Sequence, residues 1–192
     1  MMVKDLVLKN RSYRRFFEDH KIDSETLRDL IALTRKTPSA ANRQPLKYIL
    51  SNSTENNAKI FETLAWAGYL KDWPGPEKGE RPSAYIVVLG DTEIIKDFSA
   101  DPGIAMQTIL LGAVEKGLGG CMFGSVKRSL LAENLDIHER YQILFVIALG
   151  KPKEHVILEE ITGADIKYWR DDNLNHHVPK RTMDELILKT LP

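Results

Sequence analysis

The sequence predicts a single domain in which helices pack around a sheet of apolar strands. Residues 84–90 and 143–150 are almost wholly apolar and rich in β-branched side chains, as is typical of strands covered on both faces. Helical patterns precede, separate and follow these two runs. A chain of 192 residues is long enough for one good core, so this alternation indicates an α/β or α+β fold.

The first expected helix covers residues 24–36. Asp23 or Ser24 can cap it, because a short polar side chain accepts hydrogen bonds from the free amides of a first turn. Thr37 precedes a proline, and this position disfavours helical backbone, so the helix should end there. A short strand is expected next, over residues 46–50.

A second helix should begin at Ser53 or Thr54. Its apolar positions, which we expect to point inward, are Ile60, Phe61, Leu64 and Ala65. Residues 72–82 contain three prolines and two glycines, and this composition predicts a loop.

The next expected helix, residues 101–116, is apolar on nearly every side. Asp101 and Pro102 suit its cap and first turn. A helix of this kind is buried, either in its own domain or between subunits. Residues 117–124 should then form a glycine-rich turn and a short strand, and residues 125–134 a further helix.

Composition argues against several classes of protein. Lysine plus arginine equals aspartate plus glutamate, 27 each, and a neutral chain is a poor match for a nucleic-acid backbone. No apolar run is long enough to span a bilayer, and the first residues lack the apolar core of a secretory signal, so we expect a cytoplasmic protein. Cys121 is the one cysteine, which leaves no disulfide within the chain and no cysteine-based zinc site.

Three segments carry groups that suit a ligand. In "RSYRRF", residues 11–16, guanidinium and hydroxyl groups could hold a phosphate, although such clusters are more often solvated turns. In "TPSAANRQP", residues 37–45, Asn42 and Gln44 offer donors and acceptors to a polar ring edge, with an internally bonded loop as the alternative. Residues 117–124 lack the dinucleotide and Walker fingerprints; their amides could approach a planar ligand, or the glycines could serve tight packing.

The tail, residues 151–192, reads as a polar segment that ends in a short helix at 183–189. His176 and His177 lie in it, but adjacent side chains point apart on a strand and no acidic ligand is fixed nearby, so we predict no metal site. Cys121 lies among apolar residues, which favours an inert thiol. Since no acid, base or nucleophile stands out, a cofactor could carry the chemistry.

Five segments, in order, resemble the nitroreductase family of FMN-dependent oxidoreductases. The family's Arg-Ser-x-Arg-x-Phe matches residues 11–16, Pro-Ser-x-x-Asn-x-Gln-Pro matches 38–45, and Asp-x-Gly-x-Ala-x-Gln matches 101–107. Gly-Leu-Gly stands at 117–119, and a strand closing in "ALGKP" at 148–152. Each motif alone is weak, but five in order are specific.

The resemblance implies a homodimer with an α+β fold, in which helices flank a central, mostly antiparallel sheet and FMN lies at the dimer interface. Residues 1–192 would form one domain, with the tail from about 151–192 reaching the partner subunit and the helix from Pro102 in the core of the dimer.

The resemblance also implies a set of cofactor-binding residues and no catalytic side chain, because the flavin carries the chemistry. The FMN phosphate would contact Arg11, Ser12, Arg14, Arg181 and Lys180. The flavin ring would contact Ser39, Asn42 and Gln44, some of them from the other subunit, and the backbone of Gly119 and Gly120.

The family's reaction is a ping-pong hydride transfer. NAD(P)H reduces flavin N5 and leaves, and an electron-poor acceptor such as a nitroaromatic or a quinone takes its place. Flavin-fragmenting or dehalogenating relatives, and a non-catalytic FMN-binding protein, are the alternatives. The helical segment that covers the site in larger members is not evident here, so Trp73, Tyr168 and Trp169 become candidates for the pocket wall, with peripheral packing as the other interpretation.

Overall fold

The computed structural model describes residues 2–161, 163 and 165–191. Its centre is an antiparallel sheet with the strand order β1-β5-β3-β2, and β4 also pairs with β5, at residues 146–150. The strands are β1 Phe16–Phe17, β2 Leu46–Ser51, β3 Ala84–Asp91, β4 Gly119–Phe123 and β5 Tyr141–Pro152. Every residue of β3 is buried, which confirms the predicted central strand.

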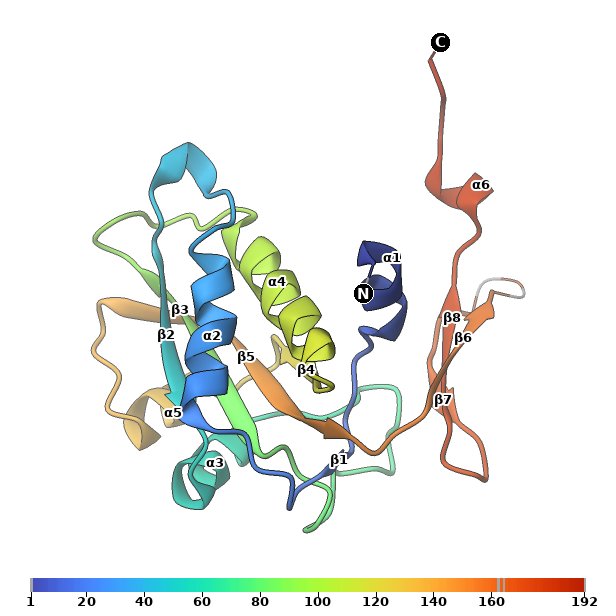
Figure 1. The fold of residues 1–192 in the computed structure, drawn as a ribbon, viewed down its shortest axis with the longest axis horizontal. Coiled ribbons are helices and arrows are strands. Elements are labelled where there is room, and N and C mark those ends of the chain that lie inside the picture. Colours follow the sequence, from blue (N-terminus) through green and yellow to red (C-terminus); the bar gives the residue numbers. More distant parts are fainter. Residues whose placement is uncertain (1, 162, 164, 192) are drawn as a thin grey trace.

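Helices cover both faces of this sheet (Figure 1). One face carries α2 (Ser24–Thr34) and α4 (Asp101–Glu115), which share a core with Ile86 of β3. The other face carries α3 (Thr54–Phe61) and α5 (Arg128–Asn134), beside Tyr85. Because neighbouring side chains of a strand point to opposite faces, β3 and β5 serve both cores at once. The predicted α+β architecture with a central antiparallel sheet is confirmed.

Several helix boundaries differ from the predictions. The helix α2 ends at Thr34, two residues early; α3 ends at Phe61, and Leu64 is buried whereas Ala65 is exposed. The expected inward position of Ala65 was therefore wrong. Leu64 forms an antiparallel bridge with Val126, and the Ala65 amide donates to the carbonyl of residue 125. This pairing keeps both segments extended, so α3 stops early and α5 starts three residues later than predicted.

The N-terminal and C-terminal segments hold more structure than the sequence indicated. A helix, α1 (Val3–Lys9), precedes the basic motif. The tail forms a second sheet of order β6-β8-β7, with β6 Val156–Glu160, β7 Trp169–Arg170 and β8 His176–Lys180. Its last helix, α6 (Met183–Leu186), is shorter than predicted.

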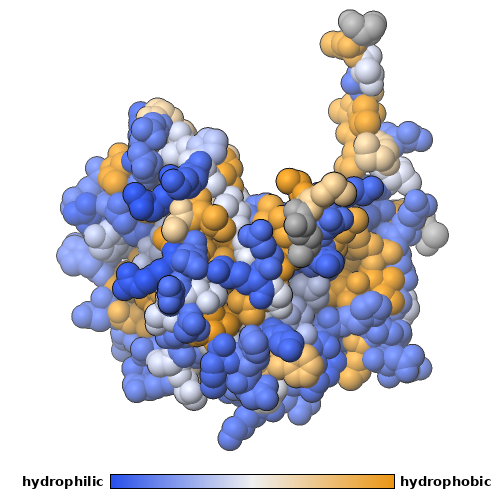
Figure 2. Space-filling model, in the orientation of Figure 1, coloured by the Kyte–Doolittle hydropathy of each residue, from blue (hydrophilic) through white to orange (hydrophobic). Residues whose placement is uncertain are grey.

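The end of the chain then projects away from the body of the molecule (Figure 1). Apolar side chains gather along this projection (Figure 2). Over the residues that the structure describes, no helix combines the length and the apolar character needed to cross a membrane.

Candidate functional site

Four of the five predicted phosphate-binding residues, all except Arg181, come together around one cavity of about 430 Å³. Arg11, Ser12 and Arg14 reach it from the segment between α1 and β1, and Lys180 from the end of β8. The other residues that line it are Asn10, Gln107, Leu110, Met122, Val156, Tyr168, His176 and Val178. Basic residues near the two ends of the sequence, Arg11 and Arg14 on one side and Lys180 on the other, thus line the same cavity.

The backbone of the basic motif is held in place from two sides. Ser12 forms a parallel bridge with Gly120 of β4, and the Tyr13 amide donates to the Gly120 carbonyl at 3.0 Å. The Arg14 amide donates to a Glu154 carboxylate oxygen at 2.9 Å, and the other oxygen of Glu154 accepts from Arg170 at 2.6 Å. Glu154 is only 5% exposed, so this pairing fixes the direction in which the motif presents its side chains.

Gly119 and Gly120 are required by neighbours within the chain. A Cβ at Gly120 would lie 2.4 Å from the carbonyl oxygen of Ala148, and one at Gly119 would lie 2.5 Å from the Tyr13 ring. Tight packing, the alternative interpretation of this glycine-rich stretch, therefore accounts for both glycines. The contact of their amides with a planar ligand stays a prediction.

Sequence reasoning did not single out His176 for this cavity. Arg14 Nη1 lies 3.1 Å from His176 Nε2, and the guanidinium sits 4.7 Å from the centre of the Tyr168 ring. Because a guanidinium can only donate, Nε2 accepts and the imidazole proton is on Nδ1. Burial first, and then the charge of Arg14, lower the pKa of His176 to about 4, so its ring is neutral at pH 7.

The strand β8 separates the two histidines as the sequence predicted. His177 faces the other way, where its Nδ1 lies 2.5 Å from Glu159 and its ring stacks on Trp169 at 4.0 Å. The signal that could have found His176 was therefore strand alternation combined with the nearby basic pair, and not the paired histidines themselves.

The second predicted group lies in the loop around the short 3-10 helix η1 (Ala40–Asn42). Ser39 Oγ donates to Asp101 at 2.6 Å and accepts from the Gln44 amide at 2.9 Å, while Gln44 Nε2 donates to the backbone and side-chain oxygens of Asn42 at 3.1 Å. The sequence allowed an internally bonded loop here, and these bonds match it. Ser39 and Gln44 line a separate cavity of about 190 Å³.

Asp101 corrects one expectation. We predicted it as the cap of α4, but Ala100 occupies that position and the Asp101 carboxylate instead accepts from Ser39 Oγ and, at 3.0 Å, from the Ala40 amide. The same residue type suits both tasks, and the buried position of Asp101 beside the loop decides between them.

One chain does not bring the two predicted groups together. The smaller cavity meets α4 at Asp101 and Ala105, whereas the larger cavity meets it at Gln107 and Leu110. Arg181 is exposed and pairs with Glu185 at 3.0 Å, outside both cavities.

The three aromatic candidates for the pocket wall separate as well. Tyr168 lines the larger cavity, whereas Trp73 packs under the Arg170 guanidinium and Trp169 on His177. Peripheral packing is thus what the structure shows for these two tryptophans, and a place in the wall for Tyr168.

The larger cavity suits an anion joined to a planar apolar group. Its cations offer forked donors to oxygen atoms, and Leu110, Met122 and Val178 supply apolar surface. Arg11 Nε and His176 Nδ1 are both buried without a hydrogen-bond partner in the described part of the chain. Unpaired donors on two residues that line the cavity favour a ligand with acceptor atoms there.

Comparisons with known proteins show which family this chain resembles. The family model described as "Nitroreductase family" matches residues 7–151. An Archaeoglobus fulgidus protein, provisionally named NADH dehydrogenase/NAD(P)H nitroreductase, is 28% identical over 157 residues, which cover 78% of this chain and 84% of that protein.

Solved structures share the fold. A nitroreductase family protein from Streptococcus pneumoniae superposes with a TM-score of 0.70 at 17% identity and covers 98% of this chain and 100% of its own. An Exiguobacterium sibiricum protein, solved in complex with FMN, gives a TM-score of 0.66 at 18% identity, over 80% of this chain and 89% of that one. With the family model matching three quarters of the sequence, the chain belongs to the nitroreductase family.

Proposed function

We propose that this protein is an FMN-dependent oxidoreductase that takes hydride from NAD(P)H and delivers it, in a ping-pong reaction, to an electron-poor acceptor such as a nitroaromatic or a quinone. The observation that carries the proposal is the single cavity formed by Arg11, Ser12, Arg14 and Lys180 in a chain of this family. The names of the relatives support it: one is called an NAD(P)H nitroreductase, and another was solved with FMN.

Each polar side chain of the cavity has a proposed role in binding FMN. Arg11, Arg14 and Lys180 would neutralise the phosphate of FMN, and the Ser12 hydroxyl would donate to it. When bound, FMN supplies hydride acceptance and donation at its flavin ring, so no protein nucleophile is needed. His176, neutral and bonded to Arg14, holds the guanidinium in place without adding a second buried charge.

We further propose that a second copy of the chain completes the site. Ser39 and Gln44 line a separate cavity, and none of Ser39, Asn42 and Gln44 lines the basic one. In a homodimer, this loop of one subunit would meet the basic cavity of the other and offer its amides to the polar edge of the flavin. The tail of one subunit reaching the other is part of the same proposal.

The visible spectrum of the purified protein tests the cofactor. We expect flavin absorbance after reconstitution with FMN, bleaching with NADH or NADPH, and reoxidation by a nitroaromatic or a quinone. Bound flavin that no nicotinamide reduces would indicate the flavin-fragmenting or non-catalytic alternatives. No flavin binding at all would refute the proposal.

The residue assignment has its own test. Arg11→Ala combined with Arg14→Ala removes two charge-assisted contacts worth about 1.5 kcal/mol or more each, so FMN affinity should fall roughly a hundredfold or more. Arg28→Ala combined with Lys36→Ala removes the same charge from exposed positions of α2 and its C-terminal end, and should leave FMN affinity unchanged. Equal affinity in the two double variants, by fluorescence titration, would contradict the phosphate role.

A further inference from the structure

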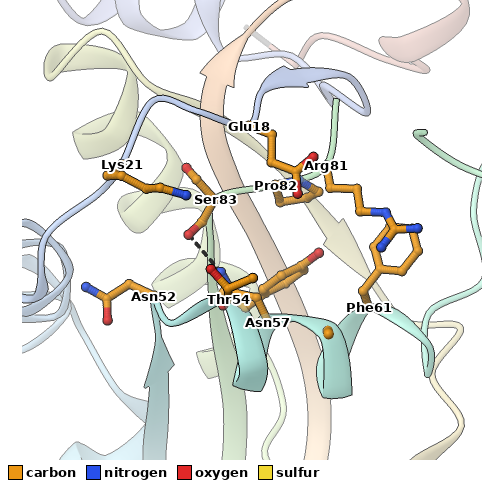
Figure 3. Close-up of a pocket in the computed structure, with 11 residues that line it drawn as sticks. Glu18, Lys21, Asn52, Thr54, Asn57, Phe61, Arg81, Pro82 and Ser83 are labelled. Carbon is orange, nitrogen blue, oxygen red and sulfur yellow. Dashed lines mark hydrogen bonds between the residues drawn. The ribbon is translucent and has the colours of Figure 1, made fainter. Parts of the chain in front are cut away.

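A small polar pocket lies on the opposite face of the sheet from α2 and α4. It is enclosed by α3, by the residues after β1 and by the segment that leads into β3 (Figure 3). Its volume is about 70 Å³, and none of its lining residues lines either cavity of the proposed cofactor site. It is therefore a separate feature of the molecule.

Three residues that line this pocket each carry a buried polar atom with no hydrogen-bond partner within the described residues. These atoms are Arg81 Nε, Ser83 Oγ and the Tyr85 hydroxyl. Tyr85 is 1% exposed and Ser83 is 4% exposed, so bulk water does not satisfy them. A buried polar group left unpaired costs about 1–3 kcal/mol, so three such atoms on lining residues favour a bound molecule or ion that pairs with them.

The chemistry of the three atoms indicates what that occupant is. Arg81 Nε can only donate, and both hydroxyls can donate. Burial strongly raises the pKa of Tyr85, so its hydroxyl keeps its proton throughout the physiological range. An occupant that accepts all three hydrogen bonds is rich in oxygen lone pairs.

The charges around the pocket favour an anion. Lys21 and Arg81 both line it, and neither forms an ion pair with any described residue. Figure 3 shows Lys21 extending toward the segment of Ser83, and Arg81 lying over Phe61, 4.3 Å from the centre of that ring. Among the described residues, Glu18 is the one acidic residue that lines the pocket, and one of its oxygens already accepts from the Gly79 amide. The local balance is one positive charge.

The volume limits the size of the anion. One water molecule needs about 10–15 Å³ of such space, so 70 Å³ holds a few waters or one small ion. Nucleotides and drug-sized ligands need pockets of about 300 Å³ or more. The pocket is too small for FMN or a nicotinamide.

We propose that this pocket is a binding site for a small oxyanion, of the phosphate, sulfate or carboxylate class, held by Arg81, Lys21 and the hydroxyls of Ser83 and Tyr85. The site lies apart from the proposed flavin cavity, and the proposal does not depend on the flavin chemistry. An anion there would join the segment before β3 to α3 and stabilise the folded chain.

Calorimetric titration of the full chain with inorganic phosphate, at constant ionic strength kept with chloride, tests the site. We expect saturable binding, at least tenfold weaker in Tyr85→Phe and in Arg81→Gln and unchanged in Lys36→Gln. Matched titrations with sulfate and with acetate identify whether a tetrahedral or a planar oxyanion fits better. No saturable binding of any of the three would overturn the proposal.

The proposed flavin cavity also contains cations, so the same titration is made in the Arg11→Ala, Arg14→Ala variant. Binding that persists there supports the new site; binding that disappears there and persists in Tyr85→Phe assigns the anion to the flavin cavity and overturns it. In buffer free of oxyanions, Tyr85→Phe should be as stable as the wild type. A large loss of stability would mean that the hydroxyl already has a partner, and would overturn the proposal as well.

Discussion

Two adjacent histidines acquire opposite properties because a strand points them to opposite sides. The pKa of His176 falls to about 4, through burial and the charge of Arg14. Burial lowers the pKa of His177 as well, but hydrogen bonds to Glu159 and Asp171 outweigh it and raise the pKa. His176 therefore costs stability as pH falls from 6.5 toward 4, while the contribution of His177 is lost as pH rises through its raised pKa.

Glu80 provides a test of how the free energy of unfolding depends on pH in the acidic range. Hydrogen bonds from Arg15, at 2.7 Å, and Lys153, at 2.9 Å, lower the pKa of this carboxylate from 4.5 to about 2. Because the folded-state pKa is depressed, the stabilisation is present above pH 4.5 and is lost as pH falls toward 2. In Glu80→Gln, the free energy of unfolding should be lower at pH 7 and should fall less steeply below pH 4.5.

Urea denaturation at pH 7, 4 and 3 measures both effects. Glu55→Gln is the control, since Glu55 is mostly exposed and pairs with Lys59 at the surface, where such a pair contributes little. A pH dependence in Glu80→Gln equal to that of the wild type would contradict the assignment.

Gly120 shows how closely the site is built into the sheet. A Cβ there would press on the Ala148 carbonyl of β5, and backbone cannot move aside cheaply. We expect Gly120→Ala to lower the free energy of unfolding by about 1–3 kcal/mol. Gly103→Ala, at an open position in α4, should be neutral or stabilising by up to about 1 kcal/mol. Chemical denaturation at fixed protein concentration checks the pair, and similar values for both would be inconsistent with the clash.

At the scale of elements, α2 depends on one cap. The sequence offered Asp23 and Ser24; in the structure the Asp23 carboxylate accepts from the Thr26 amide at 2.7 Å, and Ser24 Oγ accepts from Asn52. Asp23→Ala should destabilise the protein by about 1 kcal/mol, whereas Asp23→Asn keeps an acceptor and should cost much less. Thermal or urea denaturation distinguishes them, and an equal loss in both would assign the effect to the charge.

Elements with a strong local pattern could be predicted from the sequence, and others could not. The two apolar, β-branched runs predicted β3 and β5, and the segment that is apolar on nearly every side predicted α4. The strands β7 and β8 are short and carry charged or polar residues, so no periodic pattern marks them. This second sheet is attached to the rest of the molecule by Glu154, which accepts hydrogen bonds from the Arg14 amide and from Arg170. No local sequence pattern reveals a contact between residues so far apart.

In the candidate site, too, residues that belong to a sequence motif could be predicted, and residues that depend on distant contacts could not. Motif order brought out Arg11, Arg14 and Lys180, and the structure places them around one cavity. His176 was missed because its role depends on a contact across the fold, 162 positions from Arg14. No sequence motif indicated the proposed anion pocket beside α3, because the residues that line it come from three separate segments of the chain.

At the scale of the whole molecule, the end of the chain leaves apolar surface without a partner in the described structure. Exposed apolar residues there are Met183, Leu186, Ile187, Leu188 and Leu191, and Leu188 is 96% exposed. The chain projects from the body at this point, so its own domain does not cover them (Figures 1 and 2). A second copy of the chain would cover them if the tail reaches the partner subunit, as proposed above.

We therefore expect a dimer of twice 21.8 kDa in solution, and a weaker one when the projecting end loses its apolar side chains. Burying a leucine contributes about 1.5–3 kcal/mol, so Leu188→Ser combined with Leu191→Ser should raise the dimer dissociation constant at least tenfold. Lys189→Gln combined with Thr190→Ser alters the polar neighbours and should not. Sedimentation equilibrium measures all three, and a wild-type monomer would contradict the shared site. Because Ser39, Asn42 and Gln44 are proposed to come from the other subunit, the leucine variant should also bind FMN more weakly on dilution, whereas dilution-independent affinity would mean that one chain suffices.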